Sequence, residues 1–183
     1  MSIIEHIEET LRQIEEGWKL VAPQSGIKVV AFPRQPFDQT TTYVTIGLSD
    51  HLLTLGSARE VRQELIFSAH DWFSRQAISS FLLTFAEFIV STHQALLRGQ
   101  VIGPGEIIIP GISLNSVYAA IPVVFPEPLH TYNATDPPTV FVWIIPIHQT
   151  ETQFIQSSGW NRFEEMLEAK DPDLFDLGRL PIV

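Results

Sequence analysis

Apolar residues recur at helical spacing along the start of the chain. The stripe consists of Ile4, Ile7, Leu11, Ile14 and Trp18. Ser2 followed by Glu5 forms a capping box, in which each residue satisfies a free backbone donor at the start of a helix. The spacing therefore predicts a helix from about residue 3 to residue 18, within an N-terminal segment of residues 1–20.

Alternating or continuous apolar runs predict strands over much of the remaining chain. The predicted strands are residues 27–32, 40–48, 59–68, 107–109, 117–124 and 139–145. In the second of these, Val44, Ile46 and Leu48 share one face, as expected of a strand with one side in the core. Residues 139–145 are apolar on both faces, which predicts a strand at the centre of its sheet.

A wide apolar face runs through residues 74–98 and predicts a long central helix. Ser74 stands at its N-cap position, and Gly99 stands where a C′ glycine ends a helix. Phe85 lies on the apolar face, which we expect to pack on a sheet that contains residues 139–145.

Two shorter helices are predicted near the C-terminus. Thr150 is the expected cap of the first, with Gln153 at the capping-box position, and Gly159 separates it from a second helix at 161–170. Helices at both ends and between consecutive short strands predict an α+β fold. We expect a mostly antiparallel mixed sheet flanked by helices on one side, in a single domain of residues 1–183.

Charge is unevenly distributed along the chain. The formal net charge is −10, and residues 1–16 and 151–183 each carry −4. Such a field repels nucleic acid and attracts a basic protein partner, although two helices with solvated acidic faces would give the same composition. There is no cysteine, which excludes a disulfide framework, a thiol nucleophile and a cysteine zinc site. No apolar run is long enough for a membrane span and the N-terminus is acidic, so we expect a cytoplasmic protein without a membrane partner.

The sequence carries no recognisable catalytic motif. It has no Gly-rich phosphate loop, no Gly-x-Ser-x-Gly elbow, and no two histidines at the helical spacing of a zinc site. The acids at 164–173 lack the glycine and the alternation of a calcium loop, so no metal or cofactor is expected. His70-Asp71 is the one place where an acid directly follows a histidine, and a hydrolase that uses this pair is an alternative. Neighbours along a strand point to opposite faces, which argues against this pair.

Several stretches, taken in order, resemble the Suppressor of fused domain family. They are Tyr43–Asp50 (YVTIGLSD), Arg62–Ala69 (RQELIFSA), the helix around 77–97, Arg98–Ile102 (RGQVI), Trp143–Ile147 (WIIPI) and Asp173–Leu177 (DLFDL). The resemblance covers roughly residues 40–183. The tail departs from it, because Gly178-Arg179-Leu180-Pro181 stands where bacterial members often read Arg-Arg-Pro-Ser.

This resemblance implies a non-enzymatic domain that binds a protein or peptide. In the animal relative, the domain pairs with a second one and holds a short peptide of a Gli-type transcription factor in extended form, by strand addition. Stand-alone bacterial members are inferred to be immunity proteins that neutralise a cognate polymorphic toxin. The alternative is a regulatory peptide-binding adaptor without a toxin partner.

The family supplies no catalytic residue, so the candidate site residues are partner contacts. They are Asp50, Glu64, Trp160, Glu164, Glu165 and Glu168. Two of them also have structural interpretations: Asp50, with Ser49, can fix the turn after its strand, and Glu64 can pair with Arg62, Arg59 or a neighbouring strand. Trp143 is expected in the core and Trp160 near the surface, where tryptophan is frequent at binding hot spots.

Overall fold

The computed structural model describes residues 1–20, 25–56, 59–105 and 109–183. Within these residues the helices are α1 (Ile3–Leu11), α2 (Arg75–Thr92), α3 (Gln149–Ser158) and α4 (Trp160–Lys170), with 3-10 turns η1 (Leu48–Asp50) and η2 (Glu127–His130). The strands are β1 (Glu16–Lys19), β2 (Lys28–Pro33), β3 (Thr40–Ile46), β4 (Leu53–Leu55), β5 (Arg59–His70), β6 (Val101–Ile102), β7 (Ser116–Ala120), β8 (Thr131–Tyr132) and β9 (Thr139–Ile147). The predicted strand at 107–109 lies mostly outside the described residues.

The strands form one mixed sheet in the order β1-β2-β3-β5-β9-β7-β6, with β4 paired to β5 and β8 paired to β9. Each pairing is antiparallel except β5 with β9, which run parallel. The prediction of a mostly antiparallel mixed sheet is therefore confirmed. The central position predicted for residues 139–145 is also confirmed, because β9 lies between β5 on one side and β7 and β8 on the other.

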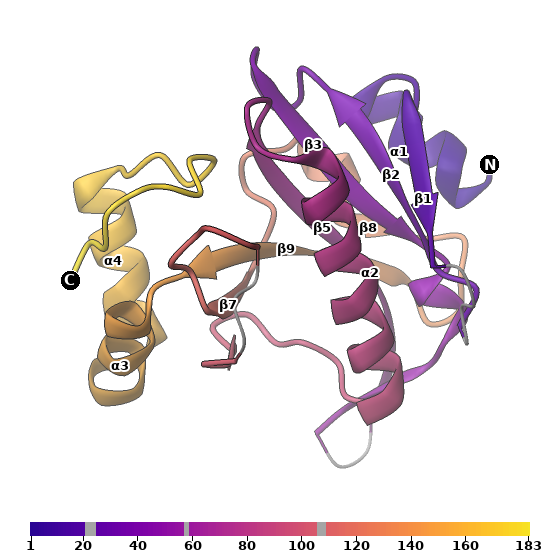
Figure 1. The fold of residues 1–183 in the computed structure, drawn as a ribbon. Coiled ribbons are helices and arrows are strands. Elements are labelled where there is room, and N and C mark those ends of the chain that lie inside the picture. The colour runs from indigo at the N-terminus through magenta and orange to yellow at the C-terminus, as the bar shows by residue number, and fades with distance from the viewer. Residues whose placement is uncertain (21–24, 57–58, 106–108) are drawn as a thin grey trace.

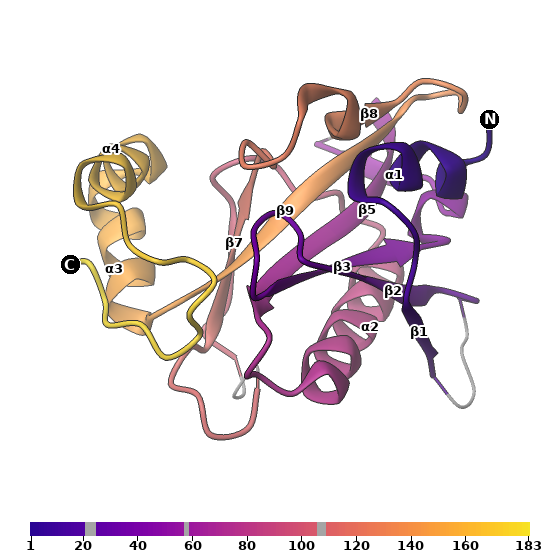
Figure 2. The same cartoon turned by 90° about the horizontal axis from the view of Figure 1, so that it is seen from above.

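Alternate residues of the strands feed two separate hydrophobic clusters, one on each face of the sheet. Val142 and Ile144 of β9 join α2 in the first cluster, and Phe141 and Trp143 join α1, α3 and α4 in the second. This is the two-residue period of a pleated strand. The predicted arrangement with helices on one side is wrong, because α2 covers one face and α1 the other, with α3 and α4 at the far end of the sheet (Figures 1 and 2).

The N-terminal helix ends at Leu11 rather than near residue 18. Its capping box is present as predicted, but Arg12 has a positive φ of 71° with ψ of −163°, a non-helical conformation that ends the helix. Leu11 is buried in the cluster under α1, whereas Trp18 packs on the opposite face, with its ring 6.1 Å from that of Tyr43. A continuous helix could not reach both faces of the sheet, so the chain turns and continues as the edge strand β1.

Other predicted boundaries are also shifted, by six residues at the end of α2 and by one or two residues at the starts of α3 and α4. Helix α2 begins after Ser74 as predicted but ends at Thr92, where His93 is left-handed with φ of 56°. Helix α3 begins after His148, whose N–H donates to Glu151 Oε2 (2.8 Å), and not after Thr150. The break between α3 and α4 at Gly159 is as predicted. Strand β7 is shorter than the predicted 117–124 because Pro122 follows its end.

Candidate functional site

Residues 93–98 follow α2 and cross from one part of the sheet to another. At one end, the Ala95 N–H donates to Thr54 O in β4 (3.0 Å). At the other, the Gly99 N–H donates to Ala119 O in β7 (2.9 Å). The segment therefore forms a roof over the sheet between β4 and β7.

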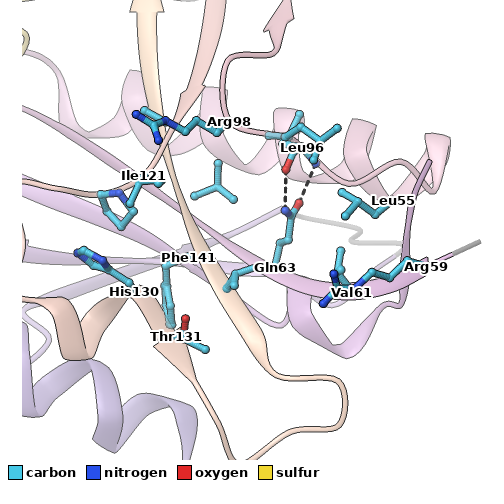
Figure 3. Close-up of a pocket in the computed structure, with 15 residues that line it drawn as sticks. Leu55, Arg59, Val61, Gln63, Leu96, Arg98, Ile121, His130, Thr131 and Phe141 are labelled. Carbon is cyan, nitrogen blue, oxygen red and sulfur yellow. Dashed lines mark hydrogen bonds between the residues drawn. The ribbon is translucent and has the colours of Figure 1, made fainter. Parts of the chain in front are cut away.

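Beneath this roof lies a cavity of about 390 Å³, here called lobe one. Val61, Val140 and Val142 of β5 and β9 contribute apolar side chains to it, and Leu96 closes it from the roof. The Gln63 side chain connects β5 to the backbone of Leu96. Its Nε2 donates to Leu96 O (2.8 Å) and its Oε1 accepts from the Leu96 N–H (2.9 Å; Figure 3). Both polar atoms of this amide are satisfied within the protein, so the interior of lobe one is an apolar surface.

A second cavity of about 410 Å³, lobe two, lies between β7, β9 and α4. Its lining includes Tyr118, Trp143, Ile145, Leu167, Leu174 and the carboxylates Glu164 and Glu168. Arg98, Ala120 and Ile121 line both lobes, and the two lobes with these shared residues are here called the two-lobed groove. Leu97, Ile121 and Val123 are exposed apolar residues along it.

Arg98 is the centre of a cluster at the junction of the lobes. Its Nε donates to Glu164 Oε1 (3.2 Å) and its Nη2 to Glu164 Oε2, while the Tyr118 hydroxyl donates to Glu164 Oε1 (2.8 Å). The guanidinium carbon lies 5.1 Å from the centroid of the Trp160 ring. The hydrogen bonds to Glu164 raise the pKa of Arg98, and burial together with the bond to Glu164 raises the pKa of Tyr118. Arg98 therefore stays charged and Tyr118 stays protonated around neutral pH, and their hydrogen bonds to Glu164 hold α4 against β7.

The structure brings three of the six predicted site residues together and leaves the other three apart. Trp160, Glu164 and Glu168 gather around Arg98 and lobe two. Glu165 lies on the outer side of α4 and pairs with Arg162 one turn away (3.1 Å). Asp50 is exposed in η1 and lines neither lobe.

Glu64 is not accessible to a protein partner in this structure, because its side chain is fully buried. Its carboxylate accepts hydrogen bonds from the Thr45 hydroxyl (2.5 Å), the Gly47 N–H (2.9 Å), and both the N–H and the hydroxyl of Ser49. Of the pairings expected for Glu64, the one to a neighbouring strand is present, while Arg62 donates to Ser49 O instead. Two of the stretches that carry the family resemblance, 43–50 and 62–69, are therefore joined through this buried carboxylate.

The side chains of His70 and Asp71 have different hydrogen-bond partners. The Nε2 of His70 lies 2.7 Å from Asp173 Oδ2, whereas Asp71 accepts from the Thr41 hydroxyl (2.6 Å). Within the described ranges, no three His, Cys, Asp or Glu side chains converge as a metal site would require. In the same part of the chain, none of the helices combines the length and the apolar character needed to cross a membrane.

The sequence did not point to Arg98, Tyr118, Arg59 or His130, which complete the groove. One available signal was Arg98-Gly99 in the resembling stretch 98–102. Gly99 was interpreted as a helix terminator, but a Cβ there would lie 2.4 Å from the Trp160 ring. Gly99 therefore allows the indole to lie against the backbone.

This mixed sheet, with α2 on one face, α1 on the other and α3 and α4 at its far end (Figure 1), is an α+β architecture shared with solved Suppressor of fused structures. The SUFU homologue from Neisseria gonorrhoeae FA 1090 superposes with a TM-score of 0.78 at 18% identity, over 99% of this chain and 94% of the other. Drosophila Suppressor of Fused gives 0.76 at 13% identity, over 98% of this chain and 50% of the other. A chain of the Sufu–Fu complex gives 0.68 at 13% identity, over 98% and 90%.

The sequence profile of the Suppressor of fused protein (SUFU) family matches residues 23–180, and the chain belongs to this family. The matched region begins before residue 40, where the sequence resemblance began. The chain is also 23% identical to the immunity protein YqcF of Bacillus subtilis (strain 168), over 87% of this chain and 83% of that protein.

Proposed function

We propose that this protein is a non-enzymatic immunity protein, which binds a cognate toxin through the two-lobed groove and the adjoining surface of α4. Family membership and the similarity to an immunity protein support the class of function. The similarity to a chain of the Sufu–Fu complex supports the proposal that the partner is a protein.

The apolar groove is the observation that carries the proposal. Val123 is 70% exposed, and Leu97 and Ile121 are exposed beside it, over two cavities lined mainly by aliphatic and aromatic side chains. A contiguous apolar surface of this kind is a common mark of a protein interaction site, because a partner removes it from water.

In this proposal the negative charge of the protein speeds its encounter with the toxin and does not supply the contacts of the bound complex. The acidic segments do not form one face, because α1 and α4 lie at opposite ends of the molecule (Figures 1 and 2). On α4, Glu164 already pairs with Arg98, and Glu165 with Arg162. The net charge of −10 would attract a basic toxin from a distance, and the groove would then supply the bound contacts.

The test is a growth assay in which the protein is co-expressed with the toxin recovered from its native host by affinity capture and mass spectrometry. Val123→Glu places a charge in the groove and should abolish both capture and protection. Leu180→Glu is the matched control, since Leu180 is 82% exposed and lines neither lobe. Full protection by Val123→Glu would contradict the assignment of the groove.

A second candidate is a peptide-binding adaptor that acts by strand addition, because β1 forms an outer edge of the sheet. An added strand would pair with the free side of β1. Hydrogen–deuterium exchange separates the candidates. Binding in the groove protects amides at 96–98 and 121–123, whereas strand addition protects those of 16–19.

A further inference from the structure

Lobe one is lined by basic side chains although the protein is strongly acidic. Three of its lining residues are basic, Arg59, Arg98 and His130, and none is Asp or Glu. Figure 3 shows these three side chains on different sides of the cavity. In a chain with 21 Asp and Glu against 11 Lys and Arg, this local composition marks a place suited to an anion.

The three bases differ in how firmly they are held. Arg98 is fixed by Glu164 and Trp160 through Nε and Nη2, and its Nη1 makes no hydrogen bond within the described residues. Arg59 is exposed, and no carboxylate of the described chain lies within 4.0 Å of its guanidinium. The ring of His130 is oriented by a hydrogen bond to Phe125 O (3.1 Å), which Nε2 must donate because a carbonyl only accepts.

The interior, by contrast, suits an apolar group. Val61, Val140 and Val142 line it, and the amide of Gln63 is satisfied by Leu96. A volume of about 390 Å³ is in the range of small-ligand pockets, which combine apolar walls with a few polar groups that fix orientation. The favoured occupant therefore has an apolar body and a carboxylate.

We propose that lobe one binds the carboxyl-terminal residue of the protein partner, with an apolar side chain in the cavity and the α-carboxylate at its basic rim. A terminal residue carries the carboxylate and an apolar side chain on one carbon, whereas an internal Asp or Glu has no apolar body. Lobe one shares Arg98 and Ile121 with lobe two, so the preceding chain would pass over these two residues toward lobe two. There Glu168 could meet a basic residue of the partner.

This inference rests on the proposed protein-binding function, and its test needs no partner. N-acetyl-leucine serves as the probe for a terminal residue, N-acetyl-leucinamide as the uncharged match, and octanoate as an aliphatic acid without a peptide group. We expect ¹⁵N NMR titration of the full chain to shift amides of Leu96 and Val142 with N-acetyl-leucine. Its Kd should be about tenfold lower than that of the amide, as for a charge-assisted hydrogen bond. Arg59→Gln should remove most of this difference, and the matched charge change Arg162→Gln on α4 should retain it.

Three outcomes would overturn the inference. They are equal binding of the acid and the amide, no shift with N-acetyl-leucine up to its solubility limit, and binding of octanoate in its place. If the probes fail while Val123→Glu still abolishes protection, the proposed function stands and only the capture of a chain terminus is lost.

Discussion

Ser49 donates two hydrogen bonds to one oxygen of Glu64, from its N–H at 3.1 Å and from its hydroxyl at 2.7 Å. The Glu64 carboxylate is fully buried and is bound by neutral donors, with no cation among its hydrogen-bond partners in the described chain. Burial raises the pKa of Glu64 from its usual 4.5 to about 7, although the hydrogen bonds from Thr45, Ser49 and Gly47 oppose the rise.

The raised pKa of Glu64 predicts a pH dependence of stability. Because the folded state holds this proton more tightly than the unfolded state, the free energy of unfolding should fall as pH rises from about 4.5 to about 7, and then level off. The expected loss is on the order of 1–3 kcal/mol. Glu64→Gln keeps an acceptor for Ser49 and Gly47 but cannot ionise, so its urea unfolding should lack this component. A parallel pH profile for the two proteins would contradict the prediction.

Phe85 tests the packing of α2 on the sheet. It is 8% exposed in the cluster under α2, whereas Phe88, one turn away on the same helix, is 45% exposed. Phe85→Ala should lower the free energy of unfolding by about 3–5 kcal/mol through lost burial and a cavity. Phe88→Ala is the control and should cost less than about 1.5 kcal/mol. Similar losses in the two variants would mean that the buried face of α2 has been assigned incorrectly.

Gly99 and Trp160 provide a test of how α4 is attached. In Gly99→Ala the new methyl group would meet the indole at 2.4 Å, and the residue has φ of 86°. Gly111 has nearly the same φ, 85°, with nothing within 4 Å of a Cβ, so Gly111→Ala measures the backbone strain alone. Thermal unfolding should show a larger loss for Gly99→Ala, by about 1–3 kcal/mol for the overpacking. Adding Trp160→Ala should remove that excess, and a purely additive double mutant would contradict the contact.

Several features of the fold could be predicted from sequence because local pattern determined them. The double-sided apolar run at 139–145 placed β9 at the centre, and Ser2 and Ser74 marked two helix starts correctly. The course of the chain after Leu11 could not be predicted, because Trp18 continues the helical spacing but packs on the other face of the sheet. That choice is made by tertiary packing, which overrides local periodicity.

The candidate site was predicted only in part, for a similar reason. Trp160, Glu164 and Glu168 were chosen as an aromatic residue and acids on one helix, which sequence displays directly. Arg98 and Tyr118 meet Glu164 across separations of 66 and 46 residues, so nothing in their own neighbourhoods marks them. Glu64 shows the opposite error, because it was chosen as a candidate partner contact, while its buried acceptor role depends on the turn at 47–49.

The tail also holds a buried ion pair that its sequence did not suggest. Arg179, in the stretch that departs from the bacterial pattern, binds both oxygens of Glu151 (2.7 and 2.8 Å), and the Ile182 N–H donates to the same carboxylate. Burial disfavours the charged form of Glu151, but the bonds from Arg179 and the backbone outweigh it and lower its pKa.

Removing one partner of this pair should be costly. Arg179→Met leaves the buried carboxylate of Glu151 unpaired and should lower the free energy of unfolding by about 3–5 kcal/mol. Adding Glu151→Gln should restore a large part of that loss. Because the pKa of Glu151 is lowered in the folded state, its contribution is complete above the usual pKa of 4.5 and is lost as pH falls through the folded value. Acid titration of unfolding should therefore show this loss in the parent but not in Glu151→Gln/Arg179→Met.

The final prediction concerns association with a basic toxin. Raising salt shortens the Debye length from about 30 Å at 0.01 M to about 8 Å at 0.15 M, so the on-rate should fall steeply while the off-rate changes much less. Glu165 and Glu168 are exposed on α4, Glu165 on the outer side of the helix and Glu168 at lobe two. Glu164 is hydrogen-bonded to Arg98 and Tyr118, so neutralising Glu164 would also disturb that cluster. We therefore expect Glu165→Gln/Glu168→Gln to slow association in stopped-flow mixing.

Glu9→Gln/Glu15→Gln is the matched control for this pair. Both residues are exposed, Glu9 in α1 and Glu15 just before β1, both line neither lobe, and the change in net charge is identical. If the partner docks at the groove, the α4 pair should slow association more than the control pair, because screened interactions decay within about a Debye length. Equal slowing would mean that only the total charge matters. A salt-independent on-rate would remove electrostatic steering and favour strand addition at β1, with its contacts along the exposed edge.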